Sequence, residues 1–287
     1  MKLNYNFAFL DETTKREIRR TILKAIAIPG YQVPFASREL PIAKGWGTGG
    51  LQITLSIIGP DDVLKVIDQG CDYSVNAVNI RKFIKAMTGV ETTTDTTKAT
   101  IIQTRHRIPE EPLRQDQILV LQVPYPEPLR LVEPSEEETR RMHAEMDYGK
   151  MYLYLYEDIL RYGEITIGAR YPVLVNKRYI MDPTPIPRWD VPKLNMANNL
   201  FLFGAGREKK IYAVPPYTTV EPLEFEDFKF RVEDFSGKAC YKCGATDTFL
   251  DEIVEDGTGR RLYACSDTSY CEKRMETIRH ARSSKGF

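Results

Sequence analysis

The sequence predicts an α+β protein: a mixed core of sheet and helix that carries an inserted subdomain and a zinc-ribbon-like module of four cysteines at its C-terminal end. Helical and strand-like patterns follow one another over the first 125 residues without a regular βα repeat. Closely spaced prolines bracket a central segment, and four of the five cysteines lie from residue 240 onward. The composition, 42% hydrophobic and 28% charged, is that of an ordinary globular protein and excludes disordered and fibrous classes.

The first predicted element is a helix over residues 11–28, with an isoleucine-rich face opposite a face of lysine and arginine. Thr14 and Glu17 have the spacing of a capping box at its start. Pro29 ends the helix, because the residue before a proline is disfavoured in the helical conformation. Gly30 is therefore expected in a loop directly after the helix.

Apolar and polar residues alternate over residues 51–57, which predicts a half-buried strand preceded by the glycine-rich loop 45–50. Residues 61–69 are interpreted as a short helix closed by Gly70. A longer helix is predicted over residues 74–88, where apolar side chains recur at helical spacing.

Two further strands are predicted over residues 100–108 and 118–123. Prolines at every second position over residues 124–128 then predict a stiff extended linker. Ser135 and Glu138 form a second capping box, which predicts a charged helix through residue 146.

A tyrosine- and leucine-rich segment over residues 151–162 and a strand over residues 173–181 complete the central part before prolines return at 183–192. Residues 201–214 have a globular pattern, and residues 222–235 form a second linker. The predicted organisation is a catalytic core of residues 1–128 and 191–235, an inserted subdomain of residues 129–190 for partner docking, a cysteine module of residues 236–275 and a basic tail of residues 276–287.

The charges are balanced, with 40 basic and 40 acidic residues and a formal net charge of zero. This balance argues against non-specific nucleic-acid binding, which needs a basic surface, and favours association with other proteins. The N-terminus has no signal-peptide pattern, and no apolar run reaches the length of a membrane span. We therefore expect a cytoplasmic protein that binds neither membranes nor nucleic acid.

The sharpest motif is the cysteine spacing C-x2-C-x21-C-x5-C, formed by Cys240, Cys243, Cys265 and Cys271. Four thiolates with one C-x2-C pair suit tetrahedral zinc or an iron–sulfur cluster, and the spacing alone favours structural zinc. A hairpin is predicted between the two pairs, as in zinc ribbons. The five-residue gap is long for a second metal knuckle, so one of the four cysteines is not expected to be a tight ligand. Cys71, outside the module, is expected to be a buried small hydrophobe.

Other candidates are residues suited to an anionic ligand. Successive glycine amides before an ordered element can form an anion-binding nest, although a plain flexible loop is the alternative. Arginine and histidine at a strand end can bind phosphate or a metal, with a surface strand end as the alternative. The candidate substrate-binding residues are Gly47, Thr48, Gly49, Gly50, Arg105, His106 and Gln122. His143 and His280 are expected to be solvated.

Five segments together resemble a known family over nearly the full chain. They are AIPGYQVP at 27–34, GWGTGG at 45–50, IQTRHRIP at 102–109, LFGAGREK at 202–209 and CSDT at 265–268. On these the chain is similar to the PhnJ family, the catalytic subunits of bacterial carbon–phosphorus lyase.

The resemblance implies radical chemistry with a [4Fe–4S] cluster and S-adenosylmethionine, which cleaves α-D-ribose 1-methylphosphonate 5-phosphate to methane and α-D-ribose 1,2-cyclic phosphate 5-phosphate. It implies that Cys240, Cys243 and Cys265 hold the cluster, that Cys271 carries a thiyl radical and that Gly30 carries a glycyl radical. For a preparation made in air, the alternatives are zinc, with Cys271 as its fourth ligand, or no metal at the cysteines.

The resemblance also implies other subunits in a core complex. We expect an ABC-type ATPase subunit on the inserted subdomain and a transition metal at His106 shared with a partner. The alternative interpretation of the sequence is a non-catalytic zinc-ribbon subunit that only mediates interactions.

Overall fold

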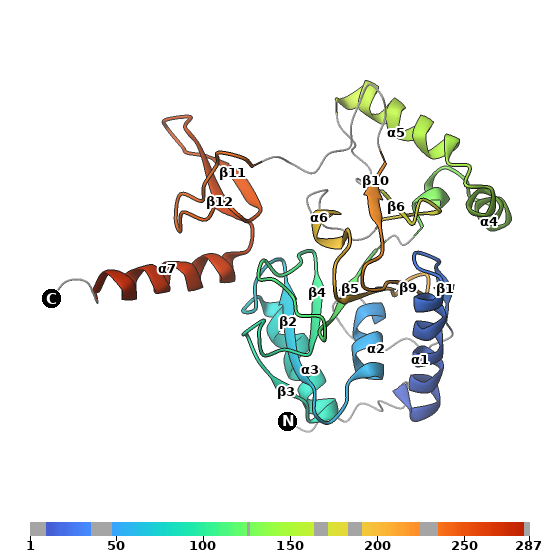
Figure 1. Ribbon diagram of the computed structural model, residues 1–287, viewed down its shortest axis with the longest axis horizontal. Coiled ribbons are helices and arrows are strands. Elements are labelled where there is room, and N and C mark those ends of the chain that lie inside the picture. Colours follow the sequence, from blue (N-terminus) through green and yellow to red (C-terminus); the bar gives the residue numbers. More distant parts are fainter. Residues whose placement is uncertain are drawn as a thin grey trace.

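The computed structural model describes residues 10–35, 48–124, 127–163, 172–182, 191–223 and 235–283. Within them, the chain forms an α+β core, a helical layer beside it and a C-terminal cysteine module (Figure 1). The predicted fold class is thereby confirmed. Gly47 and most of the proline-rich and acidic connecting segments lie outside the described residues.

The core contains a seven-stranded sheet with the order β1-β9-β8-β5-β4-β2-β3. The central strands β8, β5, β4 and β2 are parallel to one another. Near one edge, β9 runs antiparallel to both of its neighbours, β8 and β1. The strands are β1 (Val33–Pro34), β2 (Val63–Asp68), β3 (Glu91–Thr92), β4 (Ile101–Arg105), β5 (Ile118–Gln122), β8 (Leu200–Ala205) and β9 (Lys210–Val214).

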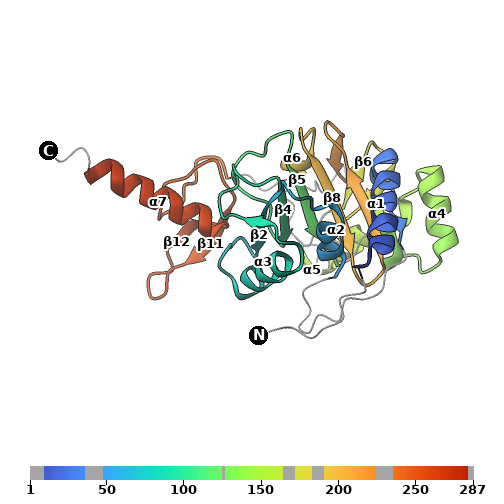
Figure 2. The same ribbon diagram turned by 90° about the horizontal axis from the view of Figure 1, so that it is seen from below.

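Three helices cover one face of this sheet, as Figure 2 shows: α1 (Glu12–Ala27), α2 (Thr48–Ile57) and α3 (Val75–Thr88). Their buried side chains form one apolar core with the strand residues that point to that face. The opposite face packs against α6 (Val191–Leu194) and a small sheet with the order β10-β6-β7. Its strands are β6 (Val173–Val175), β7 (Tyr179–Met181) and β10 (Val220–Pro222).

Between β5 and β6 the chain forms a short 3-10 helix, η2 (Pro128–Leu131), and the helices α4 (Glu136–Glu145) and α5 (Gly149–Tyr162). These have their own apolar core, to which β7 contributes Ile180. The cysteine module consists of the hairpin β11 (Leu250–Val254) and β12 (Arg261–Cys265), followed by α7 (Thr268–Ser283). The hairpin predicted between the cysteine pairs is confirmed.

Two of the sequence predictions for the core were wrong. Residues 51–57 belong to α2 and not to a strand, because the polar residues of the alternating pattern, such as Thr54, are as buried as the apolar ones. Residues 63–68 form the interior strand β2 and not a helix. Lys65 lies in this strand fully buried, where an ion pair with Asp72 (2.6 Å) compensates its charge.

Smaller predictions also change. Asp11, and not Thr14, caps α1: its carboxylate accepts the Thr14 N–H at 2.7 Å. Residues 173–181 form a hairpin instead of one strand. The proline-rich linker ends in η2, which begins at Pro128. The helices predicted at 74–88 and from Ser135 are confirmed.

Candidate functional site

The four cysteines of the C-terminal module lie together and are buried. Cys240 and Cys243 come from the loop before β11, Cys265 ends β12, and Cys271 lies in the first turn of α7. Their sulfur atoms are all within 4.8 Å of one another, with Cys240–Cys271 at 3.7 Å and Cys243–Cys265 at 3.4 Å. Helix α7 turns Cys271 back towards the other three, so the long spacing does not exclude it from the cluster.

The thiols of this cluster differ in acidity. Burial alone raises the pKa of Cys240, but the N–H groups of Cys243 and Cys265, at 3.5 and 3.4 Å from its sulfur, outweigh burial and lower that pKa to about 6. Burial raises the pKa of Cys271 to about 12 and that of Cys265 still further. Of these three thiols Cys240 is the most acidic, and a metal ion bound by Cys265 and Cys271 would displace their protons.

A second group of candidates lies at the carboxyl ends of the parallel strands. The N–H of Gly50, in the first turn of α2, donates to the side-chain oxygen of Gln122 at the end of β5. A Cβ on Gly49 would lie 2.7 Å from the backbone of Gly204 in β8, so only glycine allows α2 to approach the sheet this closely. The helix N-terminus therefore points its amides towards this edge, the usual ligand-binding edge of such sheets.

Arg105 and His106 lie at the same edge, at the end of β4. Two nitrogens of the Arg105 guanidinium donate to the buried carboxylate of Asp68, at 2.9 and 3.0 Å. His106 has a left-handed backbone (φ +75°). Burial, followed by the charge of Arg105, lowers the pKa of its imidazole. A neutral imidazole keeps the lone pair that metal coordination requires.

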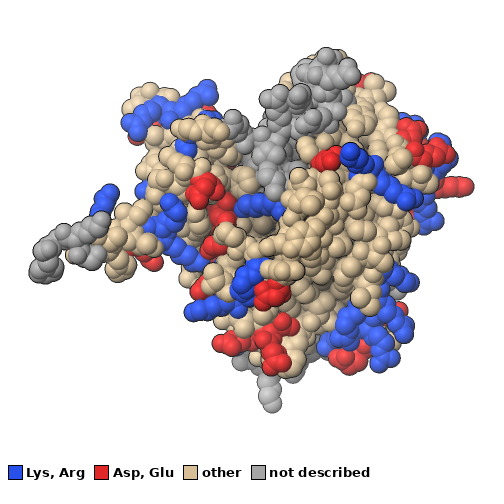
Figure 3. All heavy atoms as spheres, in the orientation of Figure 1, with Lys and Arg blue, Asp and Glu red and all other residues tan. Residues whose placement is uncertain are grey.

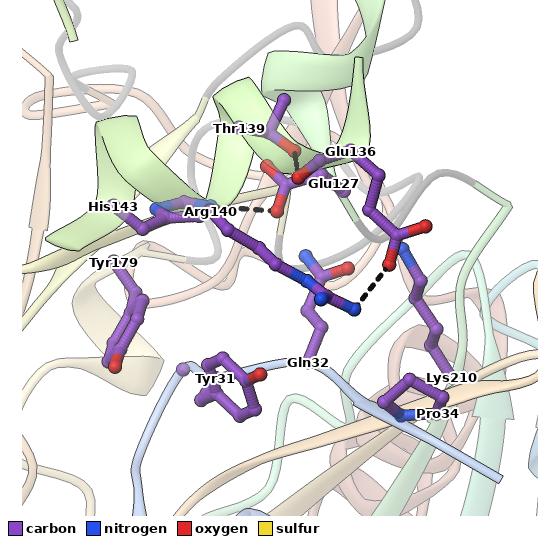
Figure 4. Close-up of a pocket in the computed structure, with 11 residues that line it drawn as sticks. Tyr31, Gln32, Pro34, Glu127, Glu136, Thr139, Arg140, His143, Tyr179 and Lys210 are labelled. Carbon is purple, nitrogen blue, oxygen red and sulfur yellow. Dashed lines mark hydrogen bonds and ion pairs between the residues drawn. The ribbon is translucent and has the colours of Figure 1, made fainter. Parts of the chain in front are cut away.

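Gly30 lines a cavity between the start of β1 and helix α4, shown in Figure 4. Its N–H donates to the carbonyl of Ala213 in β9. Its backbone is left-handed (φ +80°), and a Cβ there would lie 2.7 Å from that of Val175 and 3.1 Å from that of Tyr179. Both conformation and packing therefore require glycine, whatever its chemical role.

His143 lines the same cavity and was wrongly expected to be solvated. Only 9% of it is exposed, and its Nε2 lies 2.7 Å from the Glu127 carboxylate and its Nδ1 3.3 Å from the Tyr148 hydroxyl. Buried Thr139, Met142 and His143 have the i, i+3, i+4 spacing of one helix face, and this spacing in the sequence could have indicated burial. His280 in α7 is exposed, as expected.

The structure does not bring Gly30 and the cysteine cluster into one site. Gly30 bonds to β9, whereas the module contacts the β2–β3 side, where the N–H of Asp72 donates to the Ser269 hydroxyl at 3.3 Å. Strands β9 and β2 are four strand spacings apart, or about 19 Å. Figure 1 shows the module projecting from the side opposite α1.

The described surface also bears on possible partners. On the face shown in Figure 3, basic and acidic side chains are interspersed, without the continuous basic area that would track a nucleic-acid backbone. Among the described residues, no helix combines the length and apolar character needed to cross a membrane.

Comparison with known proteins identifies relatives over almost the whole chain. The chain is 63% identical over 270 residues to alpha-D-ribose 1-methylphosphonate 5-phosphate C-P-lyase of Rhizobium meliloti (strain 1021), which covers 94% of this chain and 91% of the relative. It is 61% identical over 272 residues to the protein of the same activity from Escherichia coli (strain K12), covering 95% and 96%. The sequence model of the family described as phosphonate metabolism protein PhnJ matches residues 3–277. The chain therefore belongs to the PhnJ family.

Proposed function

We propose that this chain is the catalytic subunit of a carbon–phosphorus lyase that converts α-D-ribose 1-methylphosphonate 5-phosphate to methane and α-D-ribose 1,2-cyclic phosphate 5-phosphate. The observation that carries the proposal is the identity of 61–63% to two relatives named for cleavage of this substrate, over more than nine-tenths of every chain compared. The second candidate, a zinc-ribbon subunit without chemistry, is supported only by the cysteine cluster.

The chemistry of the substrate favours a radical mechanism. Heterolysis of a carbon–phosphorus bond to methyl would expel a methyl carbanion, which is far too basic to leave. Acid–base groups and metal-bound hydroxide therefore have no leaving group to assist, and homolysis is the available route.

The geometry of the cysteine cluster suits a single tetrahedral metal ion. With zinc–sulfur bonds of about 2.3 Å, a tetrahedral ion places its sulfur ligands about 3.8 Å apart. The sulfur distances of 3.4 and 3.7 Å match a single ion. A [4Fe–4S] cluster also takes thiolate ligands, but its cube of iron and sulfide needs a wider opening. Cys240, Cys243 and Cys265 would hold it, with Cys271 released.

Cys240, Cys243 and Cys265 would hold such a cluster, which would supply the electron for reductive cleavage of S-adenosylmethionine. In our proposal, Gly30 carries a glycyl radical and Cys271 a thiyl radical. An α-carbon radical at Gly30 is planar and delocalised into the flanking amides. Cys271 can donate hydrogen only as a thiol, and its pKa of about 12 favours the S–H form at neutral pH. Gly30 lies beside β9, and the module that contains Cys271 lies beside β2, at the other side of the sheet. Direct hydrogen transfer between Gly30 and Cys271 therefore requires a different arrangement of the chain from the one described.

We propose that the substrate's anionic groups bind at the carboxyl ends of the parallel strands. The N-terminus of α2, with Thr48, Gly49 and Gly50, offers backbone amides and the positive end of a helix dipole. The side-chain oxygen of Gln122 accepts the N–H of Gly50, and Arg105 lies on the neighbouring strand. Gly47, outside the described residues, belongs to the same proposal. His106 would bind the substrate or hold a metal shared with a partner subunit.

The proposal includes partners and location. The chain would work in the cytoplasm, within a core complex. The segment 129–190 would dock an ABC-type ATPase subunit, and residues 1–128 with 191–235 would form the catalytic core. Residues 236–275 would hold the metal group, and 276–287 would form a basic tail.

Anaerobic reconstitution of the full complex with iron and sulfide tests the proposal. We expect an absorbance near 400 nm, cleavage of S-adenosylmethionine and release of methane from the substrate. Cys271→Ala should retain the cluster and lose methane, whereas Cys71→Ala, a thiol outside the module, should retain both. Stable zinc with neither cleavage nor methane would instead establish the interaction subunit.

A further inference from the structure

A tight turn, residues 68–71, follows β2 and lies between the sheet and the cysteine module. Two backbone hydrogen bonds close it: the N–H of Cys71 donates to the carbonyl of Asp68 at 3.1 Å, and the N–H of Asp68 donates to the carbonyl of Cys71 at 3.2 Å. Gln69 and Gly70 both have left-handed backbones, with φ of +55° and +73°. The function proposed above assigns no role to this turn.

One side of the turn contacts the end of β4. The N–H of Gln69 donates to the carbonyl of Arg105 at 3.1 Å, and the Asp68 carboxylate accepts from two nitrogens of the Arg105 guanidinium. Asp68 is only 1% exposed, so water competes little for these charge-assisted bonds. The turn therefore fixes the position of Arg105, and with it that of His106, the next residue.

The other side of the turn contacts the cysteine module. A Cβ added at Gly70 would lie 3.0 Å from the carbonyl oxygen of Ser266 and 3.3 Å from the Cα of Asp267, the two residues that follow Cys265. Both are backbone atoms, which cannot rotate away as the end of a side chain can. Only glycine at position 70 therefore allows the module to approach the turn this closely.

Polar contacts hold the module to the core farther along α7. The N–H of Asp72 donates to the Ser269 hydroxyl. The ammonium group of Lys273 donates to the carbonyl of Thr94 at 3.1 Å and lies 3.3 Å from the Glu111 carboxylate. Among the described residues, the apolar core of the module includes no side chain from the sheet. A polar interface of this kind permits relative motion, so the close contact at Gly70 matters for where the module lies.

We propose that Gly70 is a positioning residue: through it, the turn 68–71 holds the cysteine cluster beside the edge of the sheet that carries Arg105 and His106. One side of the turn fixes Arg105, and the other contacts the backbone directly after Cys265, so a single element sets the spacing between the two sites. A misplacement of about 1 Å can cost about a hundredfold in rate. The effect on catalysis rests on the proposed function, whereas the position of the module does not.

Carbodiimide coupling of the zinc-loaded full chain measures the position of the module. This reagent joins an amine to a carboxylate only when the two are in contact, and Lys273 and Glu111 form such a pair across the interface. We expect this crosslink in the wild type and at least fivefold less of it in Gly70→Ala and Gly70→Asn. Lys150 and Glu133, paired at 2.6 Å in the helical layer, are the internal control and should couple equally in every variant.

Matched variants separate the contact with the module from backbone strain. Gly89 has a similar left-handed backbone (φ +74°), but nothing lies within 4 Å of its Cβ position. Asparagine tolerates this conformation better than alanine does. Gly89→Asn should therefore destabilise less than Gly89→Ala, and both should couple as the wild type does. At Gly70 the longer asparagine side chain should reduce the crosslink at least as much as alanine. The opposite order, or an undiminished crosslink in both Gly70 variants, would overturn the proposal.

Kinetics of the reconstituted complex test the effect on catalysis. Gly70→Asn should lower kcat for methane release at least tenfold and leave KM within threefold, because Arg105 and His106 keep their places on the sheet. The cobalt spectrum of the cysteines should not change, because the module has its own core. A lost crosslink with unchanged kcat, or a raised KM alone, would refute the positioning role. If the wild-type complex releases no methane, the proposed function fails, whereas the crosslink still decides whether Gly70 positions the module.

A second variant covers the case in which the Gly70 variants do not fold. Lys273→Glu leaves the turn intact, lies at a half-exposed position of α7 and repels Glu111. It should speed hydrogen exchange of the Asp72 amide, which donates to Ser269, at least tenfold and lower kcat as Gly70→Asn does. Unchanged exchange together with unchanged kcat would overturn the proposal.

Discussion

Replacement of Gly30 by alanine should destabilise the chain through two separate effects. The left-handed backbone at Gly30 (φ +80°) disfavours any residue with a Cβ, at a cost of about 1–2 kcal/mol. The new Cβ would also lie 2.7 Å from that of Val175, which is fully buried in β6. Overpacking of this kind costs about 1–3 kcal/mol, so the total expected for Gly30→Ala is about 2–5 kcal/mol.

Gly89 offers a matched control. It has a similar backbone (φ +74°), but nothing lies within 4 Å of the position of its Cβ. Gly89→Ala should therefore show only the backbone cost, about 1–2 kcal/mol. The difference between the two variants isolates the contact with Val175 and Tyr179.

Urea unfolding of the purified chain measures both variants, together with Val175→Ala and the double variant. Val175→Ala should cost about 0.5 kcal/mol less in the Gly30→Ala background than in the wild type, because it removes the Cγ1 atom that the new Cβ would approach to 3.1 Å and gives the remaining Cβ room to shift. Equal destabilisation by Gly30→Ala and Gly89→Ala, or strict additivity in the cycle, would refute the packing argument. The result matters for function, because loss of methane in Gly30→Ala would report on folding as well as on the radical. Retained far-UV circular dichroism and metal content are the necessary controls.

Three further predictions concern other parts of the chain. Asp72→Ala leaves the buried ammonium of Lys65 without its counter-charge and should lower the free energy of unfolding in urea by about 3–5 kcal/mol. The double variant Asp72→Leu with Lys65→Met should recover most of that loss. A cost below about 1 kcal/mol for Asp72→Ala would contradict this prediction. Cys271→Ser should weaken zinc binding and alter the tetrahedral d–d spectrum of the cobalt-substituted protein. The control variant Cys71→Ser should change neither the zinc affinity nor the spectrum. An unaltered spectrum in Cys271→Ser would exclude Cys271 as a ligand. The folded-state pKa of His106 is lowered, so the unfolded chain binds the proton more strongly, and its contribution to stability is lost as pH falls below about 6.5. His106→Asn should remove this loss, by at most about 1.4 kcal/mol per pH unit, and parallel stability curves for the two proteins between pH 7.5 and 5.5 would refute it.

Local signals in the sequence predicted the elements whose causes are local. Ser74 and Ser135 cap α3 and α4 through their own side chains, and Gly89 ends α3 in the left-handed conformation that glycine favours. The central strand β5 is a short apolar run, and β4 is rich in the β-branched residues Ile and Thr, so both strands were found for the same reason.

The errors fall where tertiary burial overrides the local pattern. In α2 the polar residues Gln52, Thr54 and Ser56 are as buried as their apolar neighbours, so their alternation carried no information about an exposed face. In β2 the charged residue Lys65 suggested an exposed helix face, but Lys65 is as buried as its apolar neighbours. Lys65 is tolerated there only because Asp72, after the following turn, supplies its counter-charge.

The candidate sites divide in the same way. The cysteine cluster was predictable because its metal-binding character depends on residue type and spacing, and the fold only had to bring two pairs together. The contact between Glu127 and His143 joins two segments that carry no shared motif, so no pattern in the sequence predicts it. Such groups acquire their chemical character only from the folded environment.

The position of Cys271 links the metal state of the chain to its proposed chemistry. As a ligand of a single ion bound by all four sulfurs, Cys271 must be a thiolate, because metal binding displaces the thiol proton. A thiolate has no hydrogen atom to donate, so Cys271 cannot serve as the fourth ligand and as the proposed radical residue at the same time. Zinc at the four cysteines would therefore block the reaction twice, by excluding iron and by removing the S–H of Cys271. Removal of zinc before reconstitution should consequently be required for methane release, and iron added on top of bound zinc should not restore it.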